Sequence, residues 1–357
     1  MKIWIIWLPN VWKSTLFNAL TQTYSADAAN FPFCTIEPNI WIVDVKDARL
    51  DTLSQMSNSK KTLYSTIKFV DIAWLVKWAA QWAGLWNKFL SHIREVDALV
   101  QVVRHFDHAD VIHVHNKIDP MDDVDTINTE LIIADLEQIE KTHAQLSKAK
   151  RSKDQDALLE VVTICFNDLK NWIMIYDSEF STEQKKILAW LQLLTAKPLI
   201  YALNIAENKL SDYHSIEKEF AMLLHKPVIS VCAQFESELL GLDEAERADY
   251  VWWFGDVPTL DRLIACAFDA VGLMYYFTTW EKESRSRTIP KWSTAPQAAW
   301  AIHTDFERWF IKAEVIAYDD FVKSWSRSKA RESWHLKLQW KEYIVQDWDI
   351  IVFKFNV

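Results

Sequence analysis

The sequence predicts an α/β protein whose mostly parallel sheet is interrupted by a helical hairpin and followed by a small mixed domain. Three observations lead to this prediction. Short apolar runs alternate with stretches of helical spacing, as in parallel sheets covered on both faces. Two heptad-like stripes break the alternation after residue 128, and it resumes near residue 198. Short strands recur after residue 278, so we expect a first domain at 1–127 and 196–277, a helical insertion at 128–195 and a third part at 278–357.

The first domain is expected to begin with a strand, a loop and a helix. Residues 2–7 are an apolar run, and residues 8–11 read as a loop. Leu16, Phe17 and Leu20 then have the spacing of one helix face within residues 13–20. Further strands are expected at residues 40–45, 66–70, 98–103, 198–203 and 227–231.

The insertion is expected to be an antiparallel helical hairpin. Apolar side chains follow a 4-3-4-3 spacing in two stripes joined by the basic turn KAKRSKDQ. The stripes are Ile132, Leu136, Ile139, His143 and Leu146, and then Leu158, Val162, Cys165, Leu169 and Trp172. We interpret His143 as a seam residue rather than a metal ligand. In the third part we expect strands at 315–317, 337–338, 342–345 and 350–355 and a helix at 298–309.

Composition excludes several classes of protein. The 357 residues are 50% hydrophobic and 25% charged with a net charge of −10, which is typical of a globular chain rather than a disordered one. The four cysteines form no CxxC pair, which argues against a disulfide scaffold or zinc ribbon and is typical of the reducing cytosol. No apolar run reaches the ~18 residues of a membrane span, and the first run is too short for a signal peptide. We therefore expect a cytoplasmic protein without a membrane partner.

The balance of glycine and tryptophan is abnormal. At a usage of ~7%, a chain of this length would hold about 25 glycines. It holds 4, together with 20 tryptophans. Several tryptophans stand where turn chemistry favours glycine, as in Gln-Asp-Trp-Asp at 346–349. Replacement of glycine by tryptophan, in the molecule or in its sequence record, explains this better than a Trp-rich core does. We expect positive-φ backbone at several tryptophans, and residues 7, 12 and 74 in one pocket.

Residues 7–14 resemble a phosphate-binding loop. They read W-L-P-N-V-W-K-S after a strand and before a helix, which matches G-x-x-x-x-G-K-[ST] except at both glycines. In such a loop, backbone N–H groups and the helix N-terminus hold the phosphates. Lys13 would reach the β- and γ-phosphates, and Ser14 would offer its hydroxyl to Mg²⁺. The alternative is an ordinary strand–loop–helix with a chance Lys-Ser.

A second motif supports the nucleotide interpretation. The strand at 66–70 leads into Asp71-Ile-Ala-Trp74, which matches D-x-x-G with tryptophan for glycine. Asp71 would lie at the carboxyl end of its strand, where open α/β sheets bind ligands. Thr35, in the loop Asn-Phe-Pro-Phe-Cys-Thr, could be a switch residue on Mg²⁺, although a capping hydroxyl is the alternative.

Several longer runs resemble the YchF / Obg-like ATPases. These runs are NFPFCTIEPN (30–39), FVDIAWLVKWAAQWAGLWNKFL (69–90), TAPQAAWAIHTDFE (294–307) and the terminal FKFNV. The resemblance covers essentially the whole chain. It implies a P-loop NTPase domain of the GTPase type, a coiled-coil insertion and a C-terminal TGS domain of ubiquitin-like (β-grasp) fold. It also implies hydrolysis of ATP in preference to GTP, and association with ribosomes.

Two segments are candidates for reading the base. Residues 116–119, Asn-Lys-Ile-Asp, match the guanine motif N-K-x-D. However, about six residues separate a strand ending near Arg104 from one beginning near Asp110, and a parallel crossover needs a dozen or more. Asn204-Ile205-Ala206-Glu207 instead follows an apolar strand, and by resemblance its N-x-x-E form relaxes guanine selectivity. We interpret residues 116–119 as a decoy.

The resemblance implies roles for individual residues. Leu75 stands where many GTPases place a water-orienting glutamine, so His113, in the 105–115 loop, is the candidate that assists hydrolysis; a strand-surface position is the alternative. Asn10 matches family members that use K⁺. The expected catalytic residues are Lys13 and His113, the nucleotide-binding residues Asn10, Val11, Trp12, Lys13, Ser14, Thr15, Asn204, Ile205 and Glu207, and the magnesium ligands Ser14, Thr35 and, through water, Asp71.

The function expected from these residues is Mg²⁺-dependent nucleotide hydrolysis, ATP preferred, coupled to ribosome binding in translation or stress regulation. One rival is a GTPase of the Obg class. Another is a ribosome- or RNA-binding module with an inactive NTPase site, because an indole at 7 or 12 would occupy phosphate space. Basic clusters at 148–153, 282–291 and 323–331 are predicted to face ribosomal RNA phosphates, with solvated turns as the alternative for each.

Overall fold

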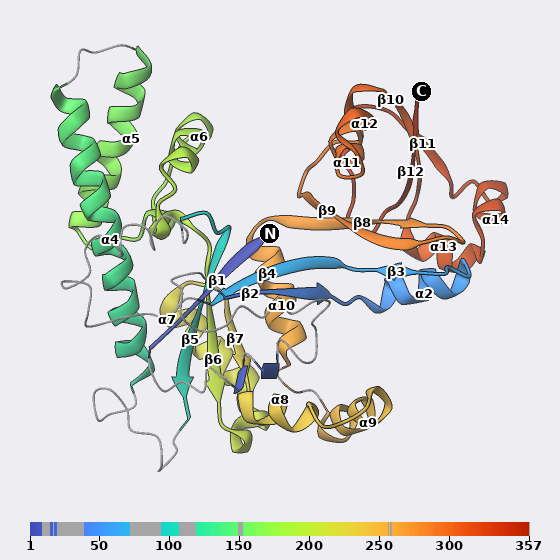
Figure 1. The fold of residues 1–357 in the computed structure, drawn as a ribbon, viewed down its shortest axis with the longest axis horizontal. Helices are drawn as coiled ribbons and strands as arrows, with labels where there is room; N and C mark the ends of the chain where they lie inside the picture. Colours follow the sequence, from blue (N-terminus) through green and yellow to red (C-terminus); the bar gives the residue numbers. More distant parts are fainter. Residues whose placement is uncertain are drawn as a thin grey trace. The chain divides into compact units, whose positions relative to one another are not determined.

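The computed structural model describes residues 1–8, 15–16, 18–19, 39–71, 94–106, 119–148, 153–255, 257 and 259–356. The chain divides into two compact units (Figure 1). The first comprises Met1–Ile42 and Lys68–Ala267, and the second comprises Val43–Ile67 and Phe268–Val357. Each unit is described by itself. In the described residues, none of the helices combines the length and apolar character needed to cross a bilayer.

A parallel sheet organises the first unit. Its strand order is β2-β4-β1-β5-β6-β7, and the pairs β1–β4, β1–β5, β5–β6 and β6–β7 are parallel. The strands are β1 (Lys2–Trp7), β2 (Asn39–Val45), β4 (Ser65–Asp71), β5 (Ala98–His105), β6 (Leu199–Ile205) and β7 (Val228–Val231). The predicted strands are therefore confirmed, with ends that differ by a few residues. The predicted fold class, a mostly parallel α/β sheet, is also confirmed.

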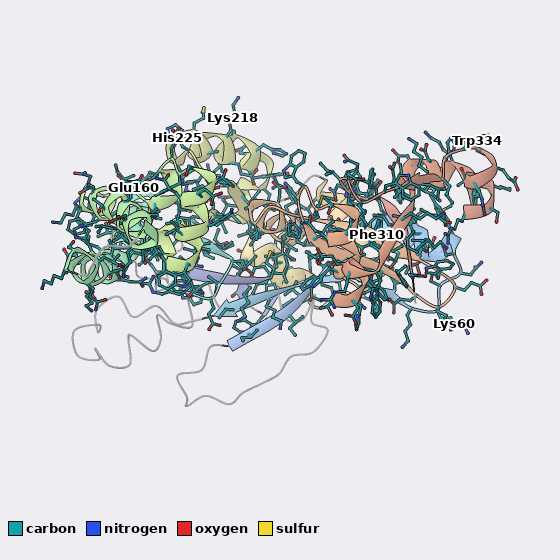
Figure 2. The ribbon with its side chains drawn as sticks, turned by 90° about the horizontal axis from the view of Figure 1, so that it is seen from above. Lys60, Glu160, Lys218, His225, Phe310 and Trp334 are labelled. Atoms are coloured by element: carbon teal, nitrogen blue, oxygen red, sulfur yellow. The ribbon has the colours of Figure 1, made fainter. Side chains whose placement is uncertain are left out.

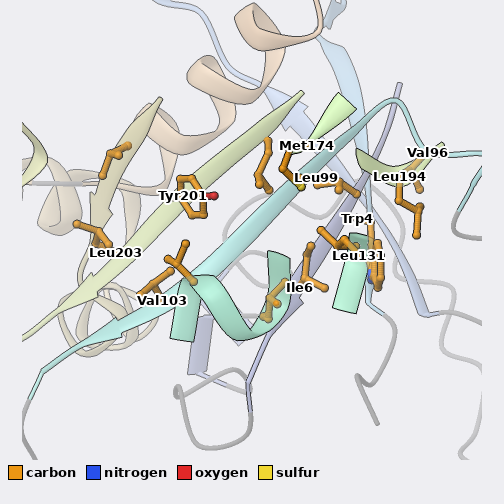
Figure 3. Close-up of a cluster of buried hydrophobic side chains, with 14 of the residues drawn as sticks. Trp4, Ile6, Val96, Leu99, Val103, Leu131, Met174, Leu194, Tyr201 and Leu203 are labelled. Atoms are coloured by element: carbon orange, nitrogen blue, oxygen red, sulfur yellow. The ribbon is translucent and has the colours of Figure 1, made fainter. Parts of the chain in front are cut away.

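The core of the first unit explains why its strands read as continuous apolar runs. β6 is buried along its whole length, and so is β5 up to Arg104, because both faces of the sheet are covered. Trp4, Ile6 and Leu99 pack with residues of the helical insertion such as Leu131 (Figure 3). Trp4 is fully buried, so this tryptophan is a core residue.

The helical hairpin consists of α4 (Pro120–Lys148) and α5 (Lys153–Lys170). His143 stacks on Phe166 with ring centroids 5.0 Å apart, so its predicted place in the seam is confirmed. α4 begins earlier than the expected boundary at 128, because Pro120 suits a first helical position and Asp122 and Asp123 suit a first turn. Trp172 was expected in the second stripe. It lies beyond the end of α5 instead and is 60% exposed.

Shorter helices complete the first unit. They are η2 (Ile175–Asp177), α6 (Thr182–Leu191), η3 (Leu194–Ala196), η4 (Glu207–Asp212), α7 (Tyr213–Leu224), α8 (Ala233–Leu239), α9 (Glu244–Phe254) and α10 (Leu260–Ala270), the last of which reaches into the second unit.

A mixed sheet of order β11-β10-β12-β8-β9-β3 organises the second unit. Its strands are β3 (Thr62–Leu63), β8 (Leu273–Thr279), β9 (Ser284–Pro290), β10 (Phe310–Ile316), β11 (Lys337–Gln339) and β12 (Ile350–Phe355). Its helices are α2 (Ala48–Met56), α11 (Ala295–Trp300), α12 (Thr304–Arg308), α13 (Tyr318–Ser324) and α14 (Arg327–Glu332). β12 pairs with β8 in parallel, whereas β8–β9 and β10–β12 are antiparallel.

The second unit departs from the sequence prediction in several places. The expected boundary at 278 falls inside β8, and neither β8 nor β9 was among the expected strands. Residues 43–67 were assigned to the first domain, but β3 pairs with β9, and Leu50 and Leu53 of α2 pack with Phe277. The helix expected at 298–309 is two short helices, because the side chain of His303 accepts from the N–H of Asp305 and begins a new helix. The strand expected at 342–345 is reduced to a single bridge between Thr294 and Ile344.

Five tryptophans adopt the left-handed backbone conformation that favours glycine. Their φ angles lie between 58° and 68°, and they are five of the eight non-glycine residues with positive φ among those described. They are Trp172, Trp292, Trp325, Trp334 and Trp348. The prediction of positive φ at several tryptophans is thus confirmed. The predicted pocket of residues 7, 12 and 74 includes positions outside the described part of the chain.

The hydrogen bonds around these tryptophans define glycine-type motifs. Trp334 follows α14 in a Schellman motif: its N–H donates to the carbonyl of Arg331, and the His335 N–H donates to that of Ala330. Trp172 follows α5 in the same way. Trp348 is the third residue of a turn closed by the Asp349 N–H and the Gln346 carbonyl, where positive φ normally requires glycine. Trp334 is 88% exposed, and the tertiary fold tolerates its indole at the surface (Figure 2).

Candidate nucleotide-binding site

The site is built at the carboxyl edge of the parallel sheet. Because β1, β4, β6 and β7 belong to one run of parallel pairs, their carboxyl ends lie at the same edge (Figure 1). Open α/β sheets bind ligands at this edge. Asp71 is the last residue of β4, and its Cα is in register with that of Ile5 on β1. Asn204 on β6 is in register with Val231, the last residue of β7.

Much of the predicted phosphate and metal site lies outside the described residues. Of the predicted site residues, these positions are Asn10, Val11, Trp12, Lys13, Ser14, Thr35 and His113. Thr15 has helical backbone and is half-buried, in agreement with a helix following the loop. Within the described ranges, no group of three or more His, Cys, Asp or Glu side chains could hold a metal ion. The backbone of Asp71 does end β4 at the edge where a metal-facing carboxylate is needed.

Asn204 ties two segments of the edge together. Its side chain is 2% exposed, and its Oδ1 accepts a hydrogen bond from the N–H of Ala233 at 3.1 Å. Ala233 begins α8, whose first N–H groups have no partner within the helix. The Asn204 carboxamide satisfies one of them, so the end of β6 and the start of α8 are fixed against each other.

Glu207 extends this connection at the surface. It is the first residue of η4, and its Oε2 accepts from Nε2 of Gln234 at 3.1 Å. Both ends of the Asn-Ile-Ala-Glu segment are therefore joined to consecutive residues of α8. Ile205 differs from its partners: its side chain is 2% exposed and packs in the core, so only its main chain is available to a ligand.

Sequence reasoning missed the α8 side of the site. Cys232, Ala233 and Gln234 come directly after a predicted strand, and this position at a sheet edge was the available signal. Burial raises the pKa of the Cys232 thiol to about 11, and its Sγ accepts from the Phe235 N–H at 3.5 Å. Cys232 is thus a capping and packing residue rather than a nucleophile.

Of residues 116–119, the structure describes only Asp119. Asp119 immediately precedes α4, and its Oδ1 accepts from the N–H of Asp122 at 3.4 Å while its carbonyl accepts from that of Asp123. This is the position of a helix N-cap. The other three residues of the Asn-Lys-Ile-Asp motif lie outside the described part of the chain, so its interpretation as a decoy stays a prediction.

The fold and this edge define the class of protein: a nucleotide-binding protein with the P-loop GTPase fold. A family model described as "50S ribosome-binding GTPase" matches residues 2–135, and the YchF GTPase C-terminal model, described as a protein of unknown function, matches residues 273–356. The chain belongs to the YchF family.

Relatives and solved structures support this assignment along the whole chain. The chain is 44% identical to "Ribosome-binding ATPase YchF" of Bacillus subtilis (strain 168), covering 99% of this chain and 98% of that protein. Identity to the protein of the same name in Escherichia coli O157:H7 is 42%, over 100% and 99%. The Schizosaccharomyces pombe YchF GTPase structure is 32% identical with a TM-score of 0.83, over 99% and 97% of the two chains. A GTP binding protein from Pyrococcus horikoshii OT3, 18% identical with a TM-score of 0.56, shares the fold.

Proposed function

We propose that this chain binds and hydrolyses a nucleoside triphosphate, with ATP preferred over GTP, and associates with ribosomes. The relatives described above are named ribosome-binding ATPases, and their similarity extends over the full chain. The observation that carries the proposal is the Asn204 side chain anchored at the carboxyl edge of the sheet, in the same short segment as Glu207.

The base preference follows from the chemistry of residue 207. Guanine presents two N–H donors to a carboxylate at the end of an N-K-x-D motif. Adenine instead presents an acceptor beside its 6-amino donor. Glu207 is one methylene longer than aspartate, and its carboxylate is engaged by Gln234 rather than directed to a free guanine edge. A base pocket of this form has lost the feature that selects guanine.

The phosphate and metal roles stay those expected from the sequence. Lys13 would hold the β- and γ-phosphates, and Ser14, Thr35 and Asp71 would hold Mg²⁺, which neutralises charge developing on the transferred phosphoryl group. Asn10 would contact phosphate and K⁺, and His113 would orient the attacking water in place of Leu75.

The proposed ribosome contact uses exposed cations, with ribosomal RNA phosphates as the partner. In the second unit some basic side chains are engaged internally: Arg327 pairs with Glu314, and Lys291 pairs with Asp269. Arg287 is half-buried, and burial lowers its pKa. Among the described residues, the other exposed cations of the three basic clusters are Lys282, Lys323, Lys329 and Arg331, together with Lys148 at the end of α4 in the first unit.

The proposal has two parts, the action on a nucleotide and the association with ribosomes. Nucleotide binding tests the first part, and ribosome co-sedimentation tests the second. Asn204→Ala removes the acceptor of the buried Ala233 N–H, and we expect it to abolish ATP binding; Asn208→Ala, in the same segment but exposed, is the matched control. Both are compared in the chain and in a Trp7→Gly/Trp12→Gly background, since indoles in the phosphate loop would obstruct the ligand. Ribosome binding without ATP binding in both backgrounds would favour the rival function, an RNA-binding module with an inactive site.

For the ribosome contact, we expect co-sedimentation to fall steeply between ~50 and ~200 mM salt, because phosphate contacts release counterions. Lys323→Glu, Lys329→Glu and Arg331→Glu together should weaken it further while ATP binding stays unchanged. Co-sedimentation that is insensitive both to salt and to these substitutions would refute the RNA contact.

A further inference from the structure

The segment after β7 contains a polar side chain that the proposed function leaves without a role. Gln234 is exposed in the first turn of α8, directly after the residue that Asn204 holds. Its side-chain amide donates to the carboxylate of Glu207, whose Oε2 lies 3.1 Å from Nε2. Asn204, Ala233, Gln234 and Glu207 therefore surround the same part of the sheet edge.

The contact with Glu207 decides which way the Gln234 amide faces. A carboxylate only accepts hydrogen bonds, so the NH₂ group of the amide must face Glu207. The carbonyl oxygen Oε1 is then on the opposite side of the amide. Gln234 thus presents an acceptor at a fixed orientation, and the hydrogen bond to Glu207 reduces the rotamer freedom that a ligand would otherwise have to restrict.

We propose that Gln234 is a specificity-determining residue for the purine, with Oε1 accepting from the 6-amino group of adenine. Adenine carries a donor at this position, whereas guanine carries the O6 acceptor. Oxygen facing oxygen leaves two acceptors without a proton between them, so the same amide rejects guanine. Glu207 positions Gln234. The two side chains together account for the preference for ATP over GTP, which the Asn-Ile-Ala-Glu segment alone explains only in part. This inference rests on the proposed function.

Gln234→Lys separates the acceptor from the contact with Glu207. A lysine ammonium still donates to Glu207 but has no acceptor for the 6-amino group. Any general attraction of the new charge to phosphates acts on ATP and GTP alike, so the ratio of their dissociation constants is the readout. The control is Gln184→Lys, because the Nε2 of Gln184 also donates to a carboxylate, Oε1 of Glu160, at 3.0 Å, on helices away from the sheet edge. Gln184 is half-buried, and its Oε1 accepts from the Ser181 N–H.

The ratio is measured by competition of ATP and GTP against a fluorescent nucleotide, in the full chain and in the Trp7→Gly/Trp12→Gly background. We expect Gln234→Lys to reduce the preference for ATP roughly five- to tenfold, the size of one hydrogen bond, and Gln234→Ala to reduce it in the same direction. Gln184→Lys should leave it unchanged. An unaltered ratio in both Gln234 variants, with ATP still preferred, would overturn this inference alone. Failure of both backgrounds to bind either nucleotide would overturn the proposed function and the inference with it.

Discussion

Replacing Trp334 by glycine is expected to stabilise the second unit. Trp334 has a φ of 62°, and a left-handed conformation costs a residue with a Cβ roughly 1–2 kcal/mol. Its side chain is 88% exposed, so little buried apolar area is lost. Glycine also raises the conformational entropy of the unfolded chain, which lowers the free energy of unfolding by about 0.4–1 kcal/mol. We therefore expect a net gain of about 0.5–1 kcal/mol for Trp334→Gly.

The matched control is Trp252→Gly. Trp252 is 81% exposed but lies in the last turn of α9, where glycine has the lower helix propensity. The same substitution should there cost up to about 0.5 kcal/mol. Trp348→Gly should be nearly neutral, because the Arg49 guanidinium lies 3.7 Å from the centroid of that ring and removing the ring loses a cation–π contact.

Urea unfolding of the three variants and the parent chain measures these differences. Intact mass is determined first, since a glycine in place of tryptophan lowers the mass by about 129 Da at each position. We argue that backbone conformation, rather than loss of the indole, decides whether each substitution raises or lowers the free energy of unfolding. Equal destabilisation by Trp334→Gly and Trp252→Gly would refute this.

Two further predictions concern buried carboxyl groups of the first unit. Asp135→Ala should lower the free energy of unfolding by about 3 kcal/mol in urea titrations, because Asp135 is fully buried, pairs with Arg94 at 2.6 Å and accepts from the N–H and hydroxyl of Thr195 at 2.7 Å; a loss below 1 kcal/mol, the size of a surface pair, would contradict this. Glu236 should make stability depend on pH, because burial raises its pKa from 4.5 to about 7. The folded state then holds a proton that the unfolded state releases, so stability should fall as pH rises from 4.5 to about 7. Glu236→Gln should flatten this slope in pH-dependent urea midpoints, and an identical slope in both proteins would contradict the assignment.

The sheet and its edge were predictable because their signals are local. Strand runs such as residues 2–7 and 199–205 are apolar throughout, and a buried parallel strand needs no other pattern. The choice of Asn204 over Asn116 as the base-reading residue rests on the crossover length and stays a prediction, because Asn116 lies outside the described residues.

The parts that sequence reasoning missed depend on contacts between distant segments. Nothing near Thr62 indicates pairing with Ser284 of β9, so the expected bounds did not group residues 43–67 with the second unit. The Gln234–Glu207 hydrogen bond likewise joins residues from different helices, α8 and η4, and neither side chain is unusual by itself. α11 ends at Trp300, and His303 begins α12 through a side-chain cap, which composition alone does not distinguish from a helix interior.

The most direct test of the proposed function is nucleotide competition in a Glu207→Asp variant. Aspartate restores the carboxylate length of the guanine motif and withdraws it from Gln234. We measure the dissociation constants of ATP and GTP for the Trp7→Gly/Trp12→Gly chain with and without this change. The proposal predicts tighter binding of ATP in the parent and a shift towards GTP in the variant. Preference for GTP in the parent, or a ratio that Glu207→Asp leaves unchanged, would contradict the assignment of residues 204–207 as the base site.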